Sequence, residues 1–175
     1  MSVISRFAGL VAAAALLIIT APAWAQQQLG DLPNNVTTTE HGDWILLCAE
    51  TPDGQRCEMV QTLSQRDNGR EQRLVQTNIG ITPNGQRLLQ IVMPLGIDLR
   101  SGIAITIDEG EEIQLPYQTC LPDGCLVLFP LDDTWFNRMR AGNELRIGFR
   151  GFGQSEVLVI EKSLRGFTAA SNGLR

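Results

Sequence analysis

The sequence has little of the side-chain chemistry that catalysis and nucleic-acid binding most often use. Its 175 residues include one histidine, His41, and one lysine, Lys162, and acidic residues outnumber basic ones 19 to 14. A pI near 4.9 argues against a nucleic-acid-binding protein, which needs a basic face to neutralise phosphates. A Ser–His or Cys–His nucleophile pair would have to be built on His41, which precedes the first predicted strand. We therefore expect neither nucleic-acid binding nor catalysis.

A secretory signal peptide is predicted at residues 1–25. Arg6 precedes an apolar run at 7–19, and the small-x-small triplet Ala23-Trp24-Ala25 follows. The apolar run is shorter than the roughly 20 residues that a membrane-spanning helix needs. No cysteine follows it that could accept a lipid anchor. We expect cleavage near Ala25 and a periplasmic or secreted protein, with a polar lead-in at 26–42 and a single domain at 43–175.

Four cysteines, Cys48, Cys57, Cys120 and Cys125, would reach an oxidising compartment. The spacing favours the local pairs Cys48–Cys57 and Cys120–Cys125, because each encloses a Pro-Asp-Gly turn that would bring two strands within disulfide reach. A four-thiolate zinc site is the alternative. Neither spacing has the two-residue gap of a zinc ribbon, so the disulfides are preferred.

Short β-prone segments separated by turn residues fill the rest of the chain. They lie at 44–49, 58–64, 73–82, 86–93, 102–107, 113–120, 125–129, 144–149 and 155–161. One helix is expected at about 132–141, where Asp132 and its neighbours supply N-cap acceptors and Gly142 supplies the C-terminal stop. A short turn near 163–170 could also be helical. Because helices do not alternate with the strands, the pattern predicts an all-β, two-sheet sandwich.

Acidic residues gather at one predicted hairpin tip, at Asp108, Glu109, Glu111 and Glu112. Carboxylates in such a group could bind Ca²⁺. Acids at a hairpin tip more often form a solvated turn that discourages edge pairing, so we expect no metal and no cofactor. Asp53 and Asp123 are interpreted as turn formers rather than as the paired carboxylates of a hydrolase.

Aromatic side chains are expected mainly in the core. They are Trp44, Tyr117, Phe129, Trp135, Phe136, Phe149, Phe152 and Phe167. Trp135 and Phe136 are adjacent, which leaves one of them available at the surface as a partner anchor. The candidate partner-binding residues are therefore Glu109, Glu111, Glu112 and Trp135. The loop at 94–102 and the turn at 121–124 are further places where a sandwich could bind a partner, as is an open sheet edge.

Six motifs in order resemble one protein family. They are Trp44 with Cys48; Cys57-Glu58-Met59; Met93-Pro94-Leu95-Gly96-Ile97-Asp98-Leu99; the second cysteine pair within 116–125; Met139-Arg140-Ala141-Gly142; and the closing segment 163–170. Together they are similar to the invasion-associated locus B family of bacterial envelope proteins. The resemblance implies an immunoglobulin-like β-sandwich, export, structural cysteine pairs and no known enzyme activity, and it supplies no catalytic or ligand-binding residues.

The interpretation that follows is a non-enzymatic binding protein of the bacterial envelope, with a protein partner in the envelope or on a host cell. A link to host invasion comes from the family resemblance alone. The alternatives are a hydrolase of envelope polymers that uses paired carboxylates, and a structural factor in envelope assembly. A hydrolase would need two carboxyl groups in a cleft, at least one with a raised pKa.

Overall fold

The computed structural model describes residues 35–175; the predicted signal peptide and the first part of the lead-in lie outside this range. Its elements are β1 (Val36–His41), β2 (Trp44–Thr51), β3 (Gly54–Asp67), β4 (Arg70–Ile81), β5 (Arg87–Met93), β6 (Ile103–Ile107), β7 (Ile113–Leu115), β8 (Thr119–Leu121), β9 (Gly124–Leu131), α1 (Asp133–Ala141), β10 (Glu144–Arg150), β11 (Val157–Ser163) and α2 (Phe167–Ser171).

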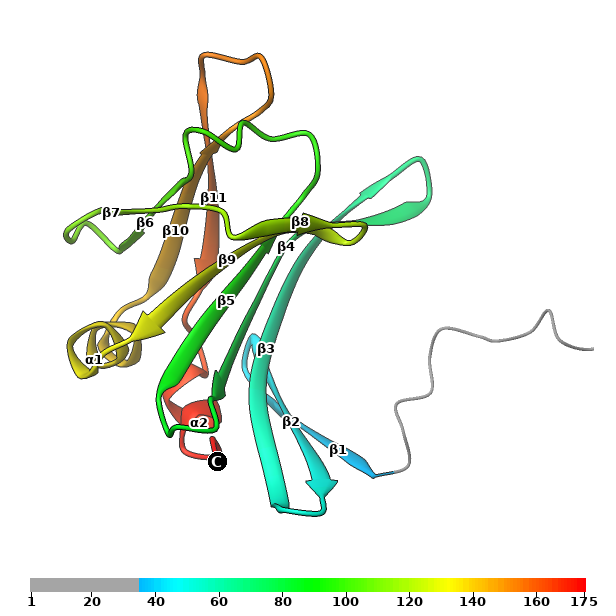
Figure 1. Ribbon diagram of the computed structural model, residues 1–175, viewed down its shortest axis with the longest axis vertical. Coiled ribbons are helices and arrows are strands. Elements are labelled where there is room, and N and C mark those ends of the chain that lie inside the picture. The colour runs from blue at the N-terminus through cyan, green and yellow to red at the C-terminus, as the bar shows by residue number, and fades with distance from the viewer. Residues whose placement is uncertain (1–34) are drawn as a thin grey trace, which may run out of the picture. The chain divides into compact units, whose positions relative to one another are not determined.

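The strands form two antiparallel sheets. Seven strands make the larger sheet in the order β1-β2-β3-β4-β5-β9-β8, and four make the smaller sheet in the order β11-β10-β6-β7 (Figure 1). The predicted all-β sandwich with two local disulfides is confirmed. No helix among residues 35–175 is long and apolar enough to cross a membrane.

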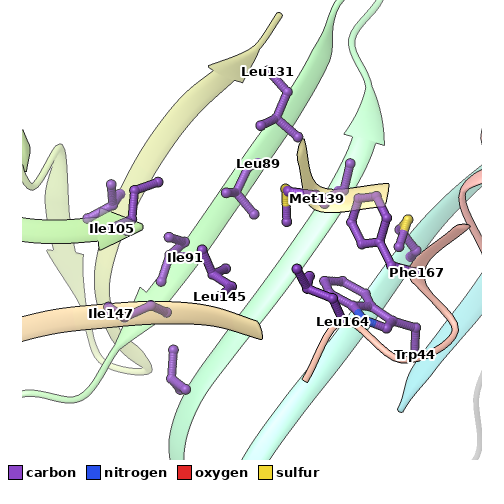
Figure 2. Packing of buried hydrophobic residues seen from close by; sticks show 14 of the residues in the cluster. Trp44, Leu89, Ile91, Ile105, Leu131, Met139, Leu145, Ile147, Leu164 and Phe167 are labelled. Atoms are coloured by element: carbon purple, nitrogen blue, oxygen red, sulfur yellow. The ribbon is translucent and has the colours of Figure 1, made fainter. Parts of the chain in front are cut away.

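The core lies between the sheets and is built by alternation along the strands. In β5 and β6 every second residue is buried, as period-2 geometry requires of a strand with one covered face. Leu89 and Ile91 of β5 face Leu145 and Ile147 of β10 (Figure 2). At one end of the core, Trp44 packs edge-to-face on Phe167, with ring centroids 5.2 Å apart. The edge-to-face contact fastens α2 to the larger sheet.

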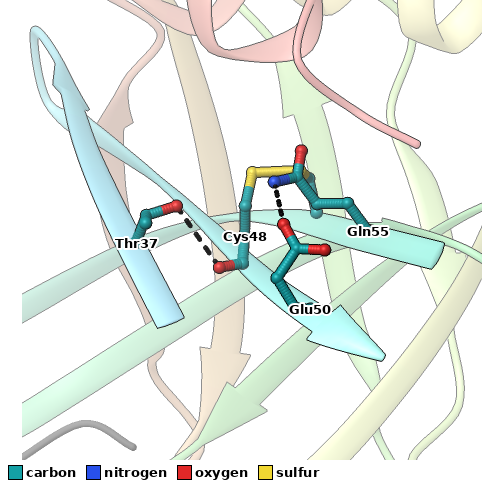
Figure 3. The surroundings of a disulfide bond; sticks show 5 residues. Thr37, Cys48, Glu50 and Gln55 are labelled. Carbon is teal, nitrogen blue, oxygen red and sulfur yellow. Dashed lines mark hydrogen bonds between the residues drawn. A yellow bond between two sulfur atoms is a disulfide. The ribbon is translucent and has the colours of Figure 1, made fainter. Parts of the chain in front are cut away.

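Both disulfides close the hairpins that the turn chemistry predicts. Cys48 pairs with Cys57 across β2 and β3, and Cys120 with Cys125 across β8 and β9. Around the first, the Thr37 hydroxyl donates to the Cys48 carbonyl at 3.4 Å, so the disulfide hairpin is also tied to β1 (Figure 3).

The first strand differs from the expected irregular lead-in. Residues 36–41 form β1, which pairs along its whole length with β2. Its Thr-rich sequence suits a strand, but its four central residues are exposed because it is an edge strand. An exposed edge strand shows no apolar alternation, which is the signal that located the other strands.

The predicted strand at 113–120 is two strands in different sheets. Ile113–Leu115 pairs with β6 in the smaller sheet, and Thr119–Leu121 pairs with β9 in the larger one. Pro116 stands between them, and a proline has no N–H to donate to a ladder. The chain therefore crosses from one sheet to the other here.

The predicted helix at 132–141 is present as α1, and its cap is the expected one. The Asp132 carboxylate accepts a hydrogen bond from the Trp135 amide at 2.7 Å. The helical turn suggested near the C-terminus is α2, which begins after Gly166.

Candidate interaction surface

The acidic turn between β6 and β7 is solvent-exposed. Glu109, Glu111 and Glu112 all lie at the surface, and Glu111 sits 3.8 Å from the Arg138 guanidinium of α1. Among residues 35–175, no group of three or more His, Cys, Asp or Glu side chains is placed to hold a metal ion. The three glutamates thus remain candidates for contact with a partner.

Asp108, the first acid of this turn, has a structural role. Its carboxylate accepts hydrogen bonds from the backbone amides of Asn143 and Glu144 at 3.0 Å each. Its own backbone takes a positive φ of 50°. The side chain therefore joins the β6–β7 turn to the start of β10.

Trp135 is not exposed. Its side chain is buried in α1 and packs edge-to-face on Phe129 of β9, with centroids 5.4 Å apart. Its neighbour Phe136 is buried as well, on the Phe167 ring. The expectation that one of this adjacent pair would reach solvent is wrong, because α1 sits over the end of the sandwich and both rings find core contacts. Trp135 could not act as an exposed anchor.

A paired-carboxylate site finds no support in the groove that contains Glu58. This hollow of about 630 Å³ lies on the outer face of the larger sheet and is lined by Leu47, Leu88 and Glu58, among others. Desolvation raises the pKa of Glu58, but no second Asp or Glu side chain lines the groove. No side-chain hydrogen bond in the described part of the chain joins His41 to a hydroxyl group.

Two loops at one end of the sandwich present large apolar side chains. Leu95 and Leu99, in the loop between β5 and β6, are 57% and 51% exposed, and Phe152, between β10 and β11, is 76% exposed. Figure 1 shows both loops at the same end, in green and orange. We call Leu95, Leu99 and Phe152 the loop-end surface.

Backbone hydrogen bonds hold these two loops together. The Phe152 amide donates to the Gly96 carbonyl at 2.8 Å, and the Asp98 amide donates to the Arg150 carbonyl at 2.9 Å. A β-bridge between Ile97 and Gly151 lies in the same place. Because the two loop backbones are hydrogen-bonded to each other, the exposed side chains are held in fixed relative positions.

The sequence indicated only half of this surface. It predicts the loop at 94–102 as a possible binding place, but it predicts Phe152 in the core. Phe152 lies between Gly151 and Gly153, and Gly153 has a positive φ of 73°. The flanking glycines were the available sign that this aromatic residue belongs to a turn rather than to a strand.

A buried lysine connects the two sheets. Lys162 of β11 is 2% exposed, and its ammonium group donates to the Gln61 carbonyl of β3 at 2.7 Å. Burial lowers the pKa of Lys162 to about 7. Gln61 in turn donates its side-chain amide to the Ser163 carbonyl at 2.9 Å. No sequence motif marks Lys162 as a buried residue.

Comparison with known proteins identifies the family. Residues 44–175 match the family model described as invasion-associated locus B protein. The chain belongs to the invasion-associated locus B family. An invasion protein B homologue of Brucella abortus is 28% identical over 141 residues, covering 79% of this chain and 80% of the relative. Invasion protein B of Bartonella bacilliformis is 26% identical over 148 residues, covering 83% and 77%.

A solved structure of a family member supports the fold. The crystal structure of invasion-associated protein B from Bartonella henselae superposes with a TM-score of 0.69 and covers 78% of this chain and 92% of its own. At 24% sequence identity, this likeness concerns the fold. Membership of the invasion-associated locus B family accords with the resemblance carried by the cysteine pairs and the closing segment.

Proposed function

We propose that this protein is an exported, non-enzymatic binding module of the bacterial envelope, and that the loop-end surface is where it binds a protein partner. The observation that carries the proposal is the clustering of Leu95, Leu99 and Phe152, each more than half exposed, on two hydrogen-bonded loops. Exposed apolar side chains that gather in one place on a soluble domain mark interaction sites.

The chemistry of the surface favours a partner with an apolar recess. Phe152 projects from a turn, and aromatic residues in such positions often supply much of the binding energy of an interface. Arg100 stands beside the leucines with its side chain 89% exposed, so acidic groups at the rim of the partner's recess would be complementary.

Two further features support export and an interaction role. Both cysteine pairs are oxidised, as is typical of proteins that work outside the cytoplasm. The relatives are named invasion proteins, which fits a partner in the envelope or on a host cell.

The proposal is tested by photo-cross-linking in the native cell. A photoreactive amino acid at position 95 should capture a reproducible protein, whereas the same group at position 121 should not. Leu121 is the comparison position because it is also 57% exposed but is the last residue of β8. Capture from position 121 and not from position 95 would place the site at the 121–124 turn instead. Leu95→Ser and Phe152→Ser should each weaken capture by a purified partner about tenfold or more, since each removes an anchor worth about 1.4 kcal/mol or more. Leu121→Ser should leave capture unchanged.

The acidic turn gives the competing location. Changing Glu109, Glu111 and Glu112 to Gln would weaken capture if that turn were the site, with no loss of thermal stability. If Leu95→Ser and Phe152→Ser leave capture of the partner unchanged and the glutamine variant loses it, the binding site is the acidic turn. Capture of only bulk envelope proteins from position 95 would contradict the binding proposal as a whole.

A further inference from the structure

The edge strand β11 of the smaller sheet has an apolar and unpaired side. Val157, Leu158 and Val159 are 49%, 48% and 51% exposed in succession. The other sheet edges differ: β1 has an exposed Thr-Thr-Thr-Glu run, and β7 and β8 have three residues each. A long edge with exposed apolar residues is a template for pairing with another strand, and proteins usually protect such edges.

The hydrogen-bond pattern shows which peptide groups of β11 point outward. The Leu164 amide donates to the Asn143 carbonyl at 2.8 Å, so Leu164 and Asn143 form a hydrogen-bonded pair. In an antiparallel ladder such pairs alternate, so Lys162, Ile160 and Leu158 bond to β10. The peptide groups of the odd-numbered residues of β11 therefore face away from the sheet.

Only some of these outward groups already have partners. The Ser163 carbonyl accepts from Trp44 at 3.3 Å and from Gln61 at 2.9 Å. No turn, loop or side-chain hydrogen bond within residues 35–175 uses the outward groups of Val157, Val159 or Glu161. The free stretch is thus 157–161, centred on Val159.

We propose that β11 pairs antiparallel with β11 of a second copy of this chain, about a twofold axis at Val159, so that the two smaller sheets join into one continuous sheet. In this register Val159 lies opposite its own copy and Val157 lies opposite Glu161 of the other copy. All three free residues on each chain then exchange hydrogen bonds, as an isologous twofold interface requires.

Side-chain chemistry favours this register over those centred closer to the end of β11. Leu158 and Ile160 become a non-hydrogen-bonded pair in which the Cα atoms approach to about 4.5 Å, so their side chains cover each other. Centring on Ile160 would require the Ser163 peptide, whose carbonyl is occupied. Centring on Glu161 would place two carboxylates directly opposite, which is destabilising.

The outer face of the joined sheet is also compatible with a second copy. There Val159 pairs within its own chain with Gly148, and Gly148 with Ala104. These three residues line a shallow hollow of about 550 Å³. No bulky or charged side chain stands next to Val159 on this row, so two copies of the row can meet without a clash.

The register is tested by cysteine cross-linking of the full mature protein after its native disulfides have formed. Val159→Cys should give a disulfide-linked dimer under mild oxidation, because opposed residues of a hydrogen-bonded pair lie about 5.5 Å apart, within disulfide reach. Val157→Cys and Glu161→Cys should each stay unlinked alone and should cross-link when the two variants are mixed. Equal cross-linking by Val157→Cys alone would overturn the register.

Sedimentation of the protein without added cysteines provides the second measurement. We expect a concentration-dependent dimer that Val159→Lys dissociates by placing two ammonium groups opposite each other, and that Val159→Thr, which keeps the β-branch, retains. A protein that stays monomeric at high concentration, with no cross-link at position 159, would overturn the proposal. Neither measurement involves the loop-end surface. The results of both are therefore independent of the function proposed above.

Discussion

Two glycines allow the backbone to approach itself closely where the β1–β2 turn meets the segment before α2. A Cβ atom on Gly166 would overlap the carbonyl oxygen of His41, and one on Gly42 would lie 2.6 Å from the carbonyl oxygen of Arg165. Both glycines have a positive φ, of 88° and 61°. The Asp43 amide donates to the same Arg165 carbonyl at 3.1 Å. This junction fixes the segment before α2 against the β1–β2 turn.

Gly166→Ala should lower stability far more than Gly153→Ala. Both residues have a positive φ, so each alanine costs about 1–2 kcal/mol of backbone strain. A Cβ at Gly153 meets nothing within 4 Å, whereas at Gly166 it meets fixed backbone. We expect a loss of unfolding free energy for Gly166→Ala that exceeds the Gly153→Ala loss by about 1–3 kcal/mol. Urea denaturation measures both, and equal losses would contradict the close approach.

Single residues were the part of the candidate site that the sequence predicted least well. Trp135 and Phe136 are adjacent on a helix, and adjacency suggested that one faces solvent, but α1 covers an end of the sandwich and buries both. Phe152 was expected inside and is, within residues 35–175, the most exposed of the large apolar residues. In each case the exposure of the residue depends on where its helix or loop packs. Composition and spacing in the sequence do not determine that position.

At the scale of elements, the two disulfide hairpins differ in how deeply they are built into the fold. Cys48 and Cys57 are both buried among core residues, whereas Cys120 is exposed on the short edge strand β8. Cys125, the partner of Cys120, is buried on β9. Because the first bridge buries two cysteines and the second buries one, their removal should have unequal effects.

Replacing both Cys48 and Cys57 by alanine should destabilise more than replacing both Cys120 and Cys125. Closing either small loop is worth about 2–3 kcal/mol in the chain-entropy model. In addition, the first pair loses the contacts of two buried sulfur atoms and the second pair those of one, a difference worth about 1 kcal/mol. Denaturant titration of the two double variants gives the comparison. A larger loss for the Cys120 and Cys125 variant would show that the β8–β9 hairpin contributes more than its exposure suggests.

Elements with strong alternation or strong turn chemistry could be predicted, and those without could not. The hairpin at Cys48–Cys57, strand β5 and helix α1 follow from Pro-Asp-Gly turns, apolar periodicity and an Asp cap. Strand β1 was missed because an edge strand of threonines has no buried face. The division at Pro116 was missed because sheet membership depends on partners distant in sequence.

At the scale of the whole molecule, the two sheets are joined by a polar contact near β11. Lys162, Gln61 and Ser163 form a chain of hydrogen bonds from the smaller sheet to β3 of the larger one. Thr77 also donates to the Gln61 carbonyl, at 3.3 Å. The Gln61 carbonyl would therefore keep a hydrogen-bond donor if Lys162 were replaced. A substitution at Lys162 thus measures the free-energy cost of burying the ammonium group without leaving this carbonyl unpaired.

The stability of the domain should depend on pH through Lys162. Burial lowers its pKa in the folded state to about 7 from 10.5. Between these values the unfolded chain holds a proton that the folded chain lacks, so the free energy of unfolding rises with pH, by up to about 1.4 kcal/mol per pH unit. Below about pH 7 both states are charged and the full cost of burial applies.

Lys162→Met and Lys162→Arg separate the ammonium from its surroundings. Lys162→Met should raise the melting temperature at pH 7 and remove the slope. Lys162→Arg should also remove the slope, because a guanidinium keeps its proton, but at a lower stability. Thermal unfolding from about pH 7 to 9.5 avoids the ionisation of Tyr117, whose pKa burial raises to about 12. A slope that persists in Lys162→Met would assign the pH dependence to another group.

Because the single lysine is buried, the outer surface of residues 35–175 carries positive charge only as guanidinium, with His41 as the one imidazole. Guanidinium groups do not react with the acylating reagents that label amines, and they are not sites of acetylation or amine-directed conjugation. The folded domain should therefore be almost inert to amine-specific chemistry, and exposure of Lys162 to such a reagent would report that the two sheets have separated.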